Sequence, residues 1–187
     1  NTDNDAATLS INDISITELD AGSAATTFTI TSSVESVNTI TVDYASSNDT
    51  ATASSDYTAT SGTATITAGN TTQTIPITHL GDAMDEANET FNITLSNATN
   101  ATISDNTGVA TINDNDAEPT VAFSAATSTH NESTSAGSIT VSLSAVSGLD
   151  ISVPFTLSGT AVADSQYSSI SSSPLTISAG SSSANIT

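Results

Sequence analysis

Apolar residues alternate with threonine or serine along most of this chain, with a period of two. Clear examples are Phe28-Thr29-Ile30, Ile40-Thr41-Val42 and Phe91-Asn92-Ile93. Alternation of this kind predicts β-strands that bury one face and expose the other, and no stretch has a convincing helical period. Threonine suits the outward positions because its branched Cβ fits a pleated surface. Similar runs occur at 9–16, 64–66, 75–77 and 109–112.

Short turn-forming sequences separate these runs, such as Asp20-Ala21-Gly22, Ser47-Asn48-Asp49 and Ser61-Gly62. The turn Ala68-Gly69-Asn70 is short enough to predict a β-hairpin between the runs on either side of it. Seven or so strands in about 110 residues are typical of an antiparallel sandwich of immunoglobulin type. The predicted fold class is therefore all-β.

The chain also repeats itself. Residues 1–6 return as residues 112–117, about 111 residues later, and residues 64–69 are echoed at 175–180. We therefore expect residues 1–5 to be the tail of a preceding repeat, residues 6–117 a complete sandwich and residues 118–187 a partial one. The partial copy has no counterpart of the last two strands, which would leave an apolar core open. We expect the missing strands to come from further along the natural polypeptide or from a neighbouring molecule.

Charge restricts the partners of this chain. It has 20 acidic residues and neither lysine nor arginine, so its formal net charge is −20. Such a charge opposes compaction unless metal ions, salt or a basic partner neutralise it. Nucleic acids are excluded as partners, and an anionic membrane surface would repel the chain. No apolar run approaches the roughly 20 residues of a membrane-spanning helix, and the absence of cysteine excludes disulfides and thiolate metal sites.

The carboxylates are clustered at strand ends and in loops of the first repeat. They lie at Glu18, at Asp49 and Asp56, between Asp82 and Glu89, and at Asp114 and Asp116. In a sandwich several of these positions could converge at one tip. Calcium takes six to eight hard oxygen ligands, and a tip rich in carboxylates supplies them. The alternative is a set of ordinary solvated turns, since aspartate favours turns in any case.

The first repeat resembles the Calx-β domain family. The resemblance rests on the strand end Asp43-Tyr44, the segment Thr50-Ala-Thr-Ala-Ser-Ser-Asp-Tyr57, Ser61-Gly-Thr63, the run Asp-Glu-Ala-Asn-Glu-Thr-Phe at 85–91 and the closing Ile-Asn-Asp-Asn-Asp at 112–116. It implies a seven-stranded sandwich that binds calcium at one tip, as in sodium–calcium exchangers. It also implies tandem arrays, as in bacterial and archaeal surface proteins.

Carried over by position, the resemblance implies eight Ca²⁺ ligands, with the carbonyl of Asn115 the weakest: Glu18, Asp49, Asp82, Glu86, Glu89, Asp114, Asn115 and Asp116. Gly81 and Asn115 stand where the exchangers have acidic residues, so fewer than four ions are expected. In the second repeat Glu132 keeps the position of Glu18 and is interpreted as a solvated loop residue. Asp3 and Asp5 would close the site of a preceding repeat.

Other chemistry is poorly supported. A catalytic carboxylate pair among Asp85, Glu86 and Glu89 would need a cleft that raises one pKa, whereas these acids are expected in polar loops. His79 and His130 have no partner motif, and no Gly-x-Ser-x-Gly elbow is present. No enzymatic activity is expected. Eight Asn-x-Ser/Thr sequons, mostly in predicted loops or outward strand positions, are candidate glycosylation sites: Asn48, Asn70, Asn88, Asn92, Asn97, Asn100, Asn131 and Asn185.

These features together predict an extracellular, calcium-stabilised repeat of a secreted or cell-surface glycoprotein, acting in adhesion, as a stalk or in a filament. Expected partners are other copies or adjacent repeats of the same protein and a surface or matrix target. Two alternatives stay open. One is a regulatory calcium-sensor module of a transporter, and the other is a filament subunit that assembles by exchanging strands between copies.

Overall fold

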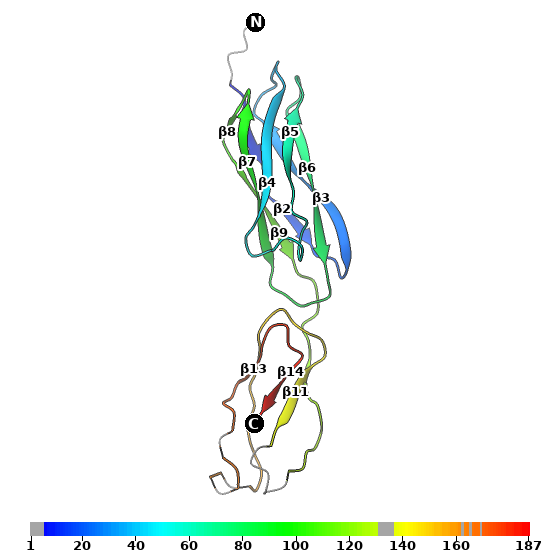
Figure 1. Cartoon of the computed structure of the whole chain (residues 1–187), viewed down its shortest axis with the longest axis vertical. Helices are drawn as coiled ribbons and strands as arrows, with labels where there is room; N and C mark the ends of the chain where they lie inside the picture. The colour runs from blue at the N-terminus through cyan, green and yellow to red at the C-terminus, as the bar shows by residue number, and fades with distance from the viewer. Residues whose placement is uncertain (1–5, 131–136, 162, 165, 169) are drawn as a thin grey trace. The chain divides into compact units, whose positions relative to one another are not determined.

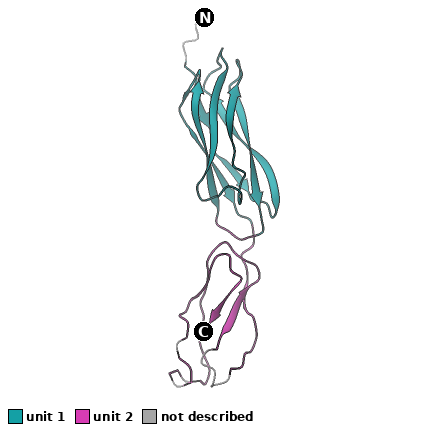
Figure 2. Cartoon of the chain, viewed as in Figure 1, with its two compact units in different colours: residues 1–83, 88–115 teal, residues 84–87, 116–187 magenta. Residues whose placement is uncertain are grey.

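The computed structural model describes residues 6–130, 137–161, 163–164, 166–168 and 170–187, and its regular elements are all β-strands (Figure 1). The all-β prediction is confirmed. The chain forms two compact units, residues 1–83 with 88–115 and residues 84–87 with 116–187 (Figure 2). No helix long and apolar enough to cross a membrane occurs in the described ranges. Some predictions fall on residues that lie outside the described ones. These are residues 1–5, which include Asp3 and Asp5, and the residues Asn131 and Glu132.

Unit 1 is a sandwich of two sheets. The four-stranded sheet has the order β6-β3-β1-β8 and the five-stranded sheet the order β2-β9-β7-β4-β5. Antiparallel pairs dominate, and β1–β8 and β2–β9 are parallel. The strands are β1 (Thr8–Ile11), β2 (Ile14–Thr17), β3 (Gly22–Ser32), β4 (Ile40–Asn48), β5 (Ser61–Ile66), β6 (Thr72–Gly81), β7 (Glu89–Thr99), β8 (Thr102–Ile103) and β9 (Thr107–Asn113).

The alternating run at 9–16 forms two strands, not one. β1 pairs with β3 in one sheet, and β2 pairs with β9 in the other. Asn12 and Asp13 make the crossing between the sheets. The Asn12 Oδ1 atom accepts from the backbone N–H of Thr29 (2.6 Å), and the Asp13 Oδ1 atom accepts from that of Val109 (2.8 Å). Each side chain therefore ties the crossing to a different sheet.

The predicted hairpin around Ala68-Gly69-Asn70 is wrong. β5 pairs with β4 and β6 pairs with β3, so the turn connects the two sheets of the sandwich instead of two neighbouring strands. Gly69 has a φ of 81°. Ile66 and Ile75, on either side of the turn, are both buried, and each faces the core from its own sheet. Turn residues and spacing are the same for a hairpin and for such an arch, so only the pairing partners distinguish them.

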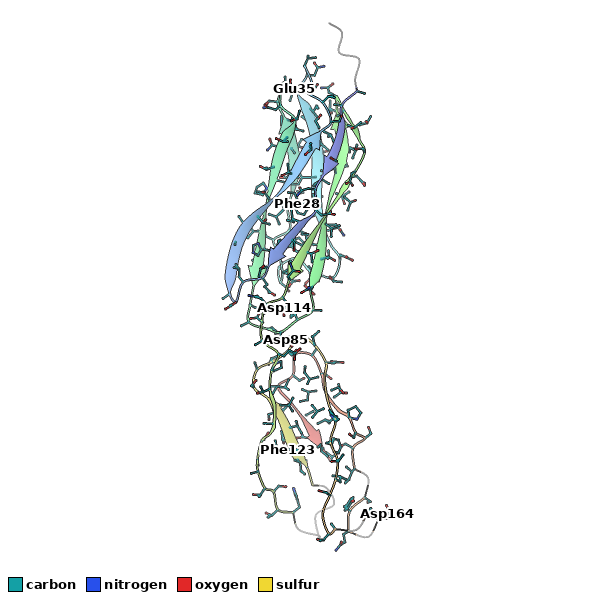
Figure 3. All side chains as sticks on the ribbon, turned by 180° about the vertical axis from the view of Figure 1, so that it is seen from behind. Phe28, Glu35, Asp85, Asp114, Phe123 and Asp164 are labelled. Atoms are coloured by element: carbon teal, nitrogen blue, oxygen red, sulfur yellow. The ribbon has the colours of Figure 1, made fainter. Side chains whose placement is uncertain are left out.

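The period of two produces the core of unit 1. Inward residues of both sheets are buried, including Ile30 and Ile77 from the four-stranded sheet and Ile40 and Ile93 from the five-stranded sheet. Phe28 lies between the sheets (Figure 3), and its ring meets that of Phe91 edge to face at 6.4 Å between centroids. Burying a large apolar side chain contributes roughly 1.5–3 kcal/mol, so these residues supply much of the free energy of folding.

Unit 2 has two smaller sheets among its described residues. One has the order β10-β11-β14 and the other pairs β12 with β13. Val141 and Ile177 are buried at the centre of a small core, whereas Val121, Phe123 and Ile139 are exposed. The strands are β10 (Val121–Phe123), β11 (Ile139–Leu143), β12 (Ile151–Val153), β13 (Leu175–Ile177) and β14 (Ser183–Ile186).

Candidate functional site: two carboxylate groups at one end of the first repeat

The parallel pairing of β2 with β9 brings two predicted ligands together. Thr17 lies opposite Asn113 in this pair, and Glu18 and Asp114 are the residues that follow them. The Glu18 N–H donates to the carbonyl of Asn113 at 2.9 Å, which holds the two chain ends side by side. Two segments almost a hundred positions apart in sequence thus place acidic side chains at the same sheet end.

The first carboxylate group consists of Glu18 and Asp114, both in unit 1. One carboxylate oxygen of each lies within 4.8 Å of one of the other. Both residues are half-buried, and the Asp114 Oδ1 atom is inaccessible and has no hydrogen-bond partner among the described residues. An isolated buried carboxylate oxygen is unfavourable, and negative neighbours make it more so. The position of Asp114, at one end of unit 1, is shown in Figure 3.

Neutral amides fix the backbone around this group. The Asn113 Nδ2 atom donates to the carbonyl of Ile16 and to the hydroxyl of Ser15, both at 2.8 Å. The Asn88 Oδ1 atom accepts from the N–H of Asp114 at 3.1 Å. These contacts set the positions of the chain ends without using a positive charge, so the carboxylates are held close together by groups that do not neutralise them.

The second carboxylate group consists of Asp56 and Glu89 of unit 1, again with one carboxylate oxygen of each within 4.8 Å of one of the other. Asp56 sits in a tight turn in which its Oδ2 atom accepts from the Thr52 N–H at 2.6 Å and from the Thr52 hydroxyl at 3.2 Å. Its carbonyl accepts from the Leu80 N–H at 2.9 Å, which anchors the turn to the end of β6. Glu89 is the first residue of β7.

Both groups lie at the same end of the five-stranded sheet. Glu89 is paired with Ile112 in the β7–β9 ladder, and Ile112 precedes Asp114 by two residues. The loop 49–57 reaches this end as well, because the Ala51 N–H donates to the carbonyl of Thr90 at 2.9 Å. The topology therefore brings acidic residues from four separate parts of the sequence to one end of the repeat.

Asp49, Asp82 and Asn115 are predicted ligands outside these two groups, and the predicted ligands Glu86 and Asp116 belong to unit 2. Asp49 is exposed, and its Oδ2 atom accepts from the Thr90 hydroxyl at 2.7 Å. Asp82 and Asn115 are exposed. The structure also explains why position 81 is a glycine, because a Cβ there would lie 1.9 Å from the carbonyl oxygen of Leu19. No side chain fits at that position, so an acidic residue there would require the backbone to move.

Sequence reasoning did not select Asp56 as a ligand, although it noted the residue beside Asp49. The available signal was its place in the segment Thr50–Tyr57, whose tight turn directs the carboxylate toward the start of β7. Asp43 is half-buried and accepts hydrogen bonds from Thr63 (2.6 Å) and Asn97 (3.1 Å). These bonds, chiefly that from Thr63, lower the pKa of Asp43.

Asp85 differs from its acidic neighbours. It is buried, and its Oδ2 atom accepts from the hydroxyl of Ser147 at 2.9 Å within unit 2. Its carbonyl accepts from the N–H of Gly148 at 2.9 Å. Ser147 is itself buried. Asp85 therefore makes structural hydrogen bonds and is separate from the two carboxylate groups.

A buried polar cluster lies behind the second group. Tyr57 stacks on Phe91 with ring centroids 4.0 Å apart, and its hydroxyl donates to the Asn48 Oδ1 atom at 2.7 Å. Burial raises the pKa of Tyr57. His79 pairs with Tyr57 through a backbone bridge and is buried, and its Nδ1 atom has no hydrogen-bond partner in the part of the chain that the structure describes. Burial lowers the pKa of His79, so the ring is neutral in the folded unit at neutral pH.

The sequons lie on accessible parts of the chain, with Asn92 half-buried on β7 and the other described ones exposed. Asn97 and Asn100 have φ angles of 52° and 62°. The Asn100 Nδ2 atom donates to the carbonyl of Thr39 at 2.8 Å. The Nδ2 atom that a glycan would occupy therefore has a structural role at these two turns.

The donor set fits a hard divalent cation. It consists of carboxylate oxygens, one of them the buried and unbonded Asp114 Oδ1 atom, and the chain has no lysine or arginine that could neutralise them. Oxygen ligands of this kind suit calcium, whereas softer metals prefer nitrogen or sulfur. A calcium ion would be held by Glu18 and Asp114 in the first group and by Asp56 and Glu89 in the second.

Comparisons with known proteins agree on the fold. The chain matches the family model described as the Calx-beta domain twice, at residues 2–117 and 114–187. A solved structure of the apo-form Calx CBD1 domain is 18% identical, with a TM-score of 0.55, covering 60% of this chain and 100% of that one. CBD12 from CALX1.2 is 19% identical with a TM-score of 0.55, covering 96% and 74%.

A third structure, the calcium binding domain CBD12 of CALX1.1, is 18% identical with a TM-score of 0.54, covering 95% of this chain and 73% of that one. No curated protein sequence matches the chain. Identities this low show the fold alone, but the two family-model matches together span the chain. This protein therefore belongs to the Calx-beta domain family, and both of its repeats are members.

Proposed function

We propose that this chain is a calcium-binding repeat in which the ion neutralises the acidic end of the first sandwich and stabilises its loops. One observation carries the proposal. The carboxylates of Glu18 and Asp114 have oxygens within 4.8 Å of each other, and the buried Asp114 Oδ1 atom accepts no hydrogen bond from the described residues. In a chain without lysine or arginine, such an arrangement favours the binding of a cation from solution.

The ion acts structurally in this proposal, and no catalytic role is assigned to the carboxylates. Both groups are formed by strand ends and loops, which are the parts of a sandwich with the fewest buried contacts. An ion bound by several of these segments restricts all of them at once. Calcium binds the folded unit in preference to the unfolded chain, so it raises stability by mass action.

We place the repeat in an extracellular protein, at a cell surface or in a secreted filament. The accessible sequons, the absence of lysine and arginine and the tandem arrangement support this setting. Its partners are adjacent or neighbouring copies of the same repeat and a surface or matrix target. Calcium is abundant outside cells, where modules commonly bind it with a Kd of about 10⁻⁴–10⁻³ M.

The test is calorimetric. Chain treated with a chelator is titrated with calcium, and the melting temperature of unit 1 is followed with the heat of binding. We expect a rise in melting temperature that saturates in the millimolar range, and no comparable rise with equal ionic strength of sodium chloride. Equal melting curves in chelator and in millimolar calcium would contradict the proposal.

A second candidate function is a calcium sensor that regulates another domain. The likeness to CBD12 of CALX1.1, which is described as a calcium binding domain, favours it. The same titration separates the two candidates, because sensor sites bind with a Kd of about 10⁻⁷–10⁻⁵ M. Saturation at micromolar calcium would support the sensor, and saturation at millimolar calcium the structural repeat.

A further inference from the structure

The outer face of the four-stranded sheet in unit 1 carries hydroxyl groups in a regular array. Phe28 and Ile30 of β3 are buried in the core, so the threonines that alternate with them point to the opposite face. Strand pairing extends the array, because Thr29 lies opposite Thr74 of β6. We call this surface the threonine face, and each of its residues is exposed or half-buried: Ser10, Thr27, Thr29, Thr31, Thr72 and Thr74.

The strands that form the threonine face carry no charged residue at their surface. β1, β3, β6 and β8 contain no aspartate or glutamate, and the histidine of β6, His79, is buried. The five-stranded sheet, in contrast, contains Asp43 and Glu89. The chain has a formal net charge of −20 and neither lysine nor arginine, so it repels another acidic molecule. At the threonine face such a molecule can approach without bringing carboxylates of these strands together.

The hydroxyl groups of the threonine face are not used within the fold. In the part of the chain that the structure describes, none of them makes a hydrogen bond. On the five-stranded sheet, in contrast, the Thr63 hydroxyl donates to Asp43 at 2.6 Å and the Thr90 hydroxyl donates to Asp49 at 2.7 Å. The hydroxyls of the threonine face are therefore available to a partner from outside unit 1.

The edges of the four-stranded sheet are poor sites for adding another strand. β6 is one edge strand, and Pro76 in its interior has no N–H to donate to a neighbouring strand. The other edge strand, β8, has two residues. A partner of this sheet is therefore expected to meet its face and not to extend it.

We propose that the threonine face binds the same face of a second copy of this chain. The charges select this partner, because a second copy is equally acidic and offers the same uncharged surface. Threonine methyl groups then pack between two aligned sheets, and the hydroxyls form hydrogen bonds across the interface. The proposal takes neighbouring copies as partners from the proposed function, and it does not depend on calcium.

The dimensions of the face indicate a weak contact. β3 has 11 residues, so at about 3.4 Å per residue the face is about 37 Å long, and four strands spaced by about 4.8 Å make it about 15 Å wide. Such a face contributes about 500 Å² from each copy, and interfaces of about 1,000 Å² in total are typical of weak, reversible association. The dimer should therefore form reversibly at high protein concentration.

The first test is sedimentation equilibrium of the whole chain in chelator, over a wide range of protein concentration. Thr29→Glu places a charge on the threonine face of each copy and should weaken association by at least about tenfold, because like charges meet across the interface. The matched control is Thr94→Glu, which changes the net charge equally at a half-buried residue of β7 in the other sheet. It should have little effect on association.

A complementary pair of variants tests whether the face binds itself. Thr29→Glu and Thr29→Lys should each associate weakly alone, and an equimolar mixture should recover association because opposite charges meet across the interface. Recovery also demonstrates that both variants are folded. Association of the unaltered chain should strengthen as sodium chloride is raised, because salt screens the repulsion between two acidic copies.

A spin label locates the interface directly. The chain has no cysteine, so Thr72→Cys provides a single attachment site at the end of the threonine face. In a mixture of spin-labelled and ¹⁵N-labelled chains, we expect broadening of amide signals in β3 and β6 of the ¹⁵N-labelled copy, and much less from a label at Thr65→Cys on β5. A monomer at all concentrations, equal effects of Thr29→Glu and Thr94→Glu, or broadening confined to unit 2 or β5 would each overturn the proposal. Because every measurement is made in chelator, none of these outcomes bears on calcium binding.

Discussion

Replacing Asp114 by asparagine should change the stability of unit 1 in opposite directions with and without calcium. The substitution keeps the size and hydrogen-bonding shape of the side chain and removes its negative charge. Without calcium it relieves repulsion from Glu18. With calcium it removes a charged ligand. A gain in stability without calcium and a loss with calcium, both at one residue, are expected when that residue helps to bind the cation.

The magnitude follows from the geometry. Two unit charges 4.8 Å apart repel by about 3.5 kcal/mol at an effective dielectric constant of about 20 and by about 0.9 kcal/mol in bulk water. Asp114 is half-buried and has one such neighbour in unit 1, Glu18, and solvent and salt reduce the repulsion. We expect Asp114→Asn to stabilise calcium-free unit 1 by about 1–3 kcal/mol. For a domain of this size that is a rise of roughly 4–12 °C in melting temperature.

In calcium the order of stability should reverse. At a calcium concentration of about 100 times the Kd, binding stabilises the wild-type unit by about 2.7 kcal/mol. The variant should lose most of this gain. Scanning calorimetry in chelator and in calcium measures both effects, and amide exchange in β2 and β9 assigns them to unit 1.

Asp43→Asn is the matched control, because Asp43 lies on β4 and hydrogen-bonds to Thr63 and Asn97 outside both carboxylate groups. It should leave the calcium increment unchanged. The stabilisation of calcium-free Asp114→Asn should also shrink as sodium chloride is raised. The reasoning is refuted if Asp114→Asn melts below the wild type in chelator and calcium stabilises both proteins equally.

Three further predictions concern unit 1. Glu89→Gln removes one carboxylate from the second group and should lower the calcium stoichiometry or weaken one class of sites about tenfold in isothermal titration, with the sites at Glu18 retained. Because burial lowers the pKa of His79, this side chain binds a proton at a higher pH in the unfolded chain than in the folded unit. The stability of unit 1 should therefore fall as pH drops below about 6.5. In thermal melts with chelator, His79→Gln should remove this contribution to the dependence of stability on pH. An unchanged dependence would mean that other titratable groups cause it. Gly108→Ala places a Cβ 2.7 Å from the carbonyl oxygen of Asn12 and 2.9 Å from the Phe28 ring, so it should cost about 1–3 kcal/mol in denaturant unfolding; Thr107→Ala, at an exposed neighbour, should cost far less.

The strands and the family could be predicted from the sequence because both depend on local patterns. Ile40, Val42 and Ile66 alternate with threonine or alanine, and their burial on one face follows directly from the period of two. The charge argument is equally local, since a chain without lysine or arginine cannot neutralise its own carboxylates. Motifs in the order found from Asp43 to Asp116 were sufficient to indicate the Calx-β fold.

Pairing partners were beyond the reach of those patterns. The run at 9–16 divides at Asn12 and Asp13 between two sheets, and the turn at Gly69 joins sheets instead of neighbouring strands. Alternation says which face of a strand is buried but not which strand lies beside it. For the same reason the sequence could not predict that Asp56 joins a carboxylate group or that Asp49 and Asp82 lie outside both groups.

The sequence alone determined that this protein is a tandem β-sandwich of high negative charge with acidic strand ends. Only the tertiary structure decided that Glu18 meets Asp114, because the parallel β2–β9 pair depends on where β1 stops. That meeting depends on contacts between distant segments, and such contacts depend on the packing of the whole sandwich, which no local pattern contains.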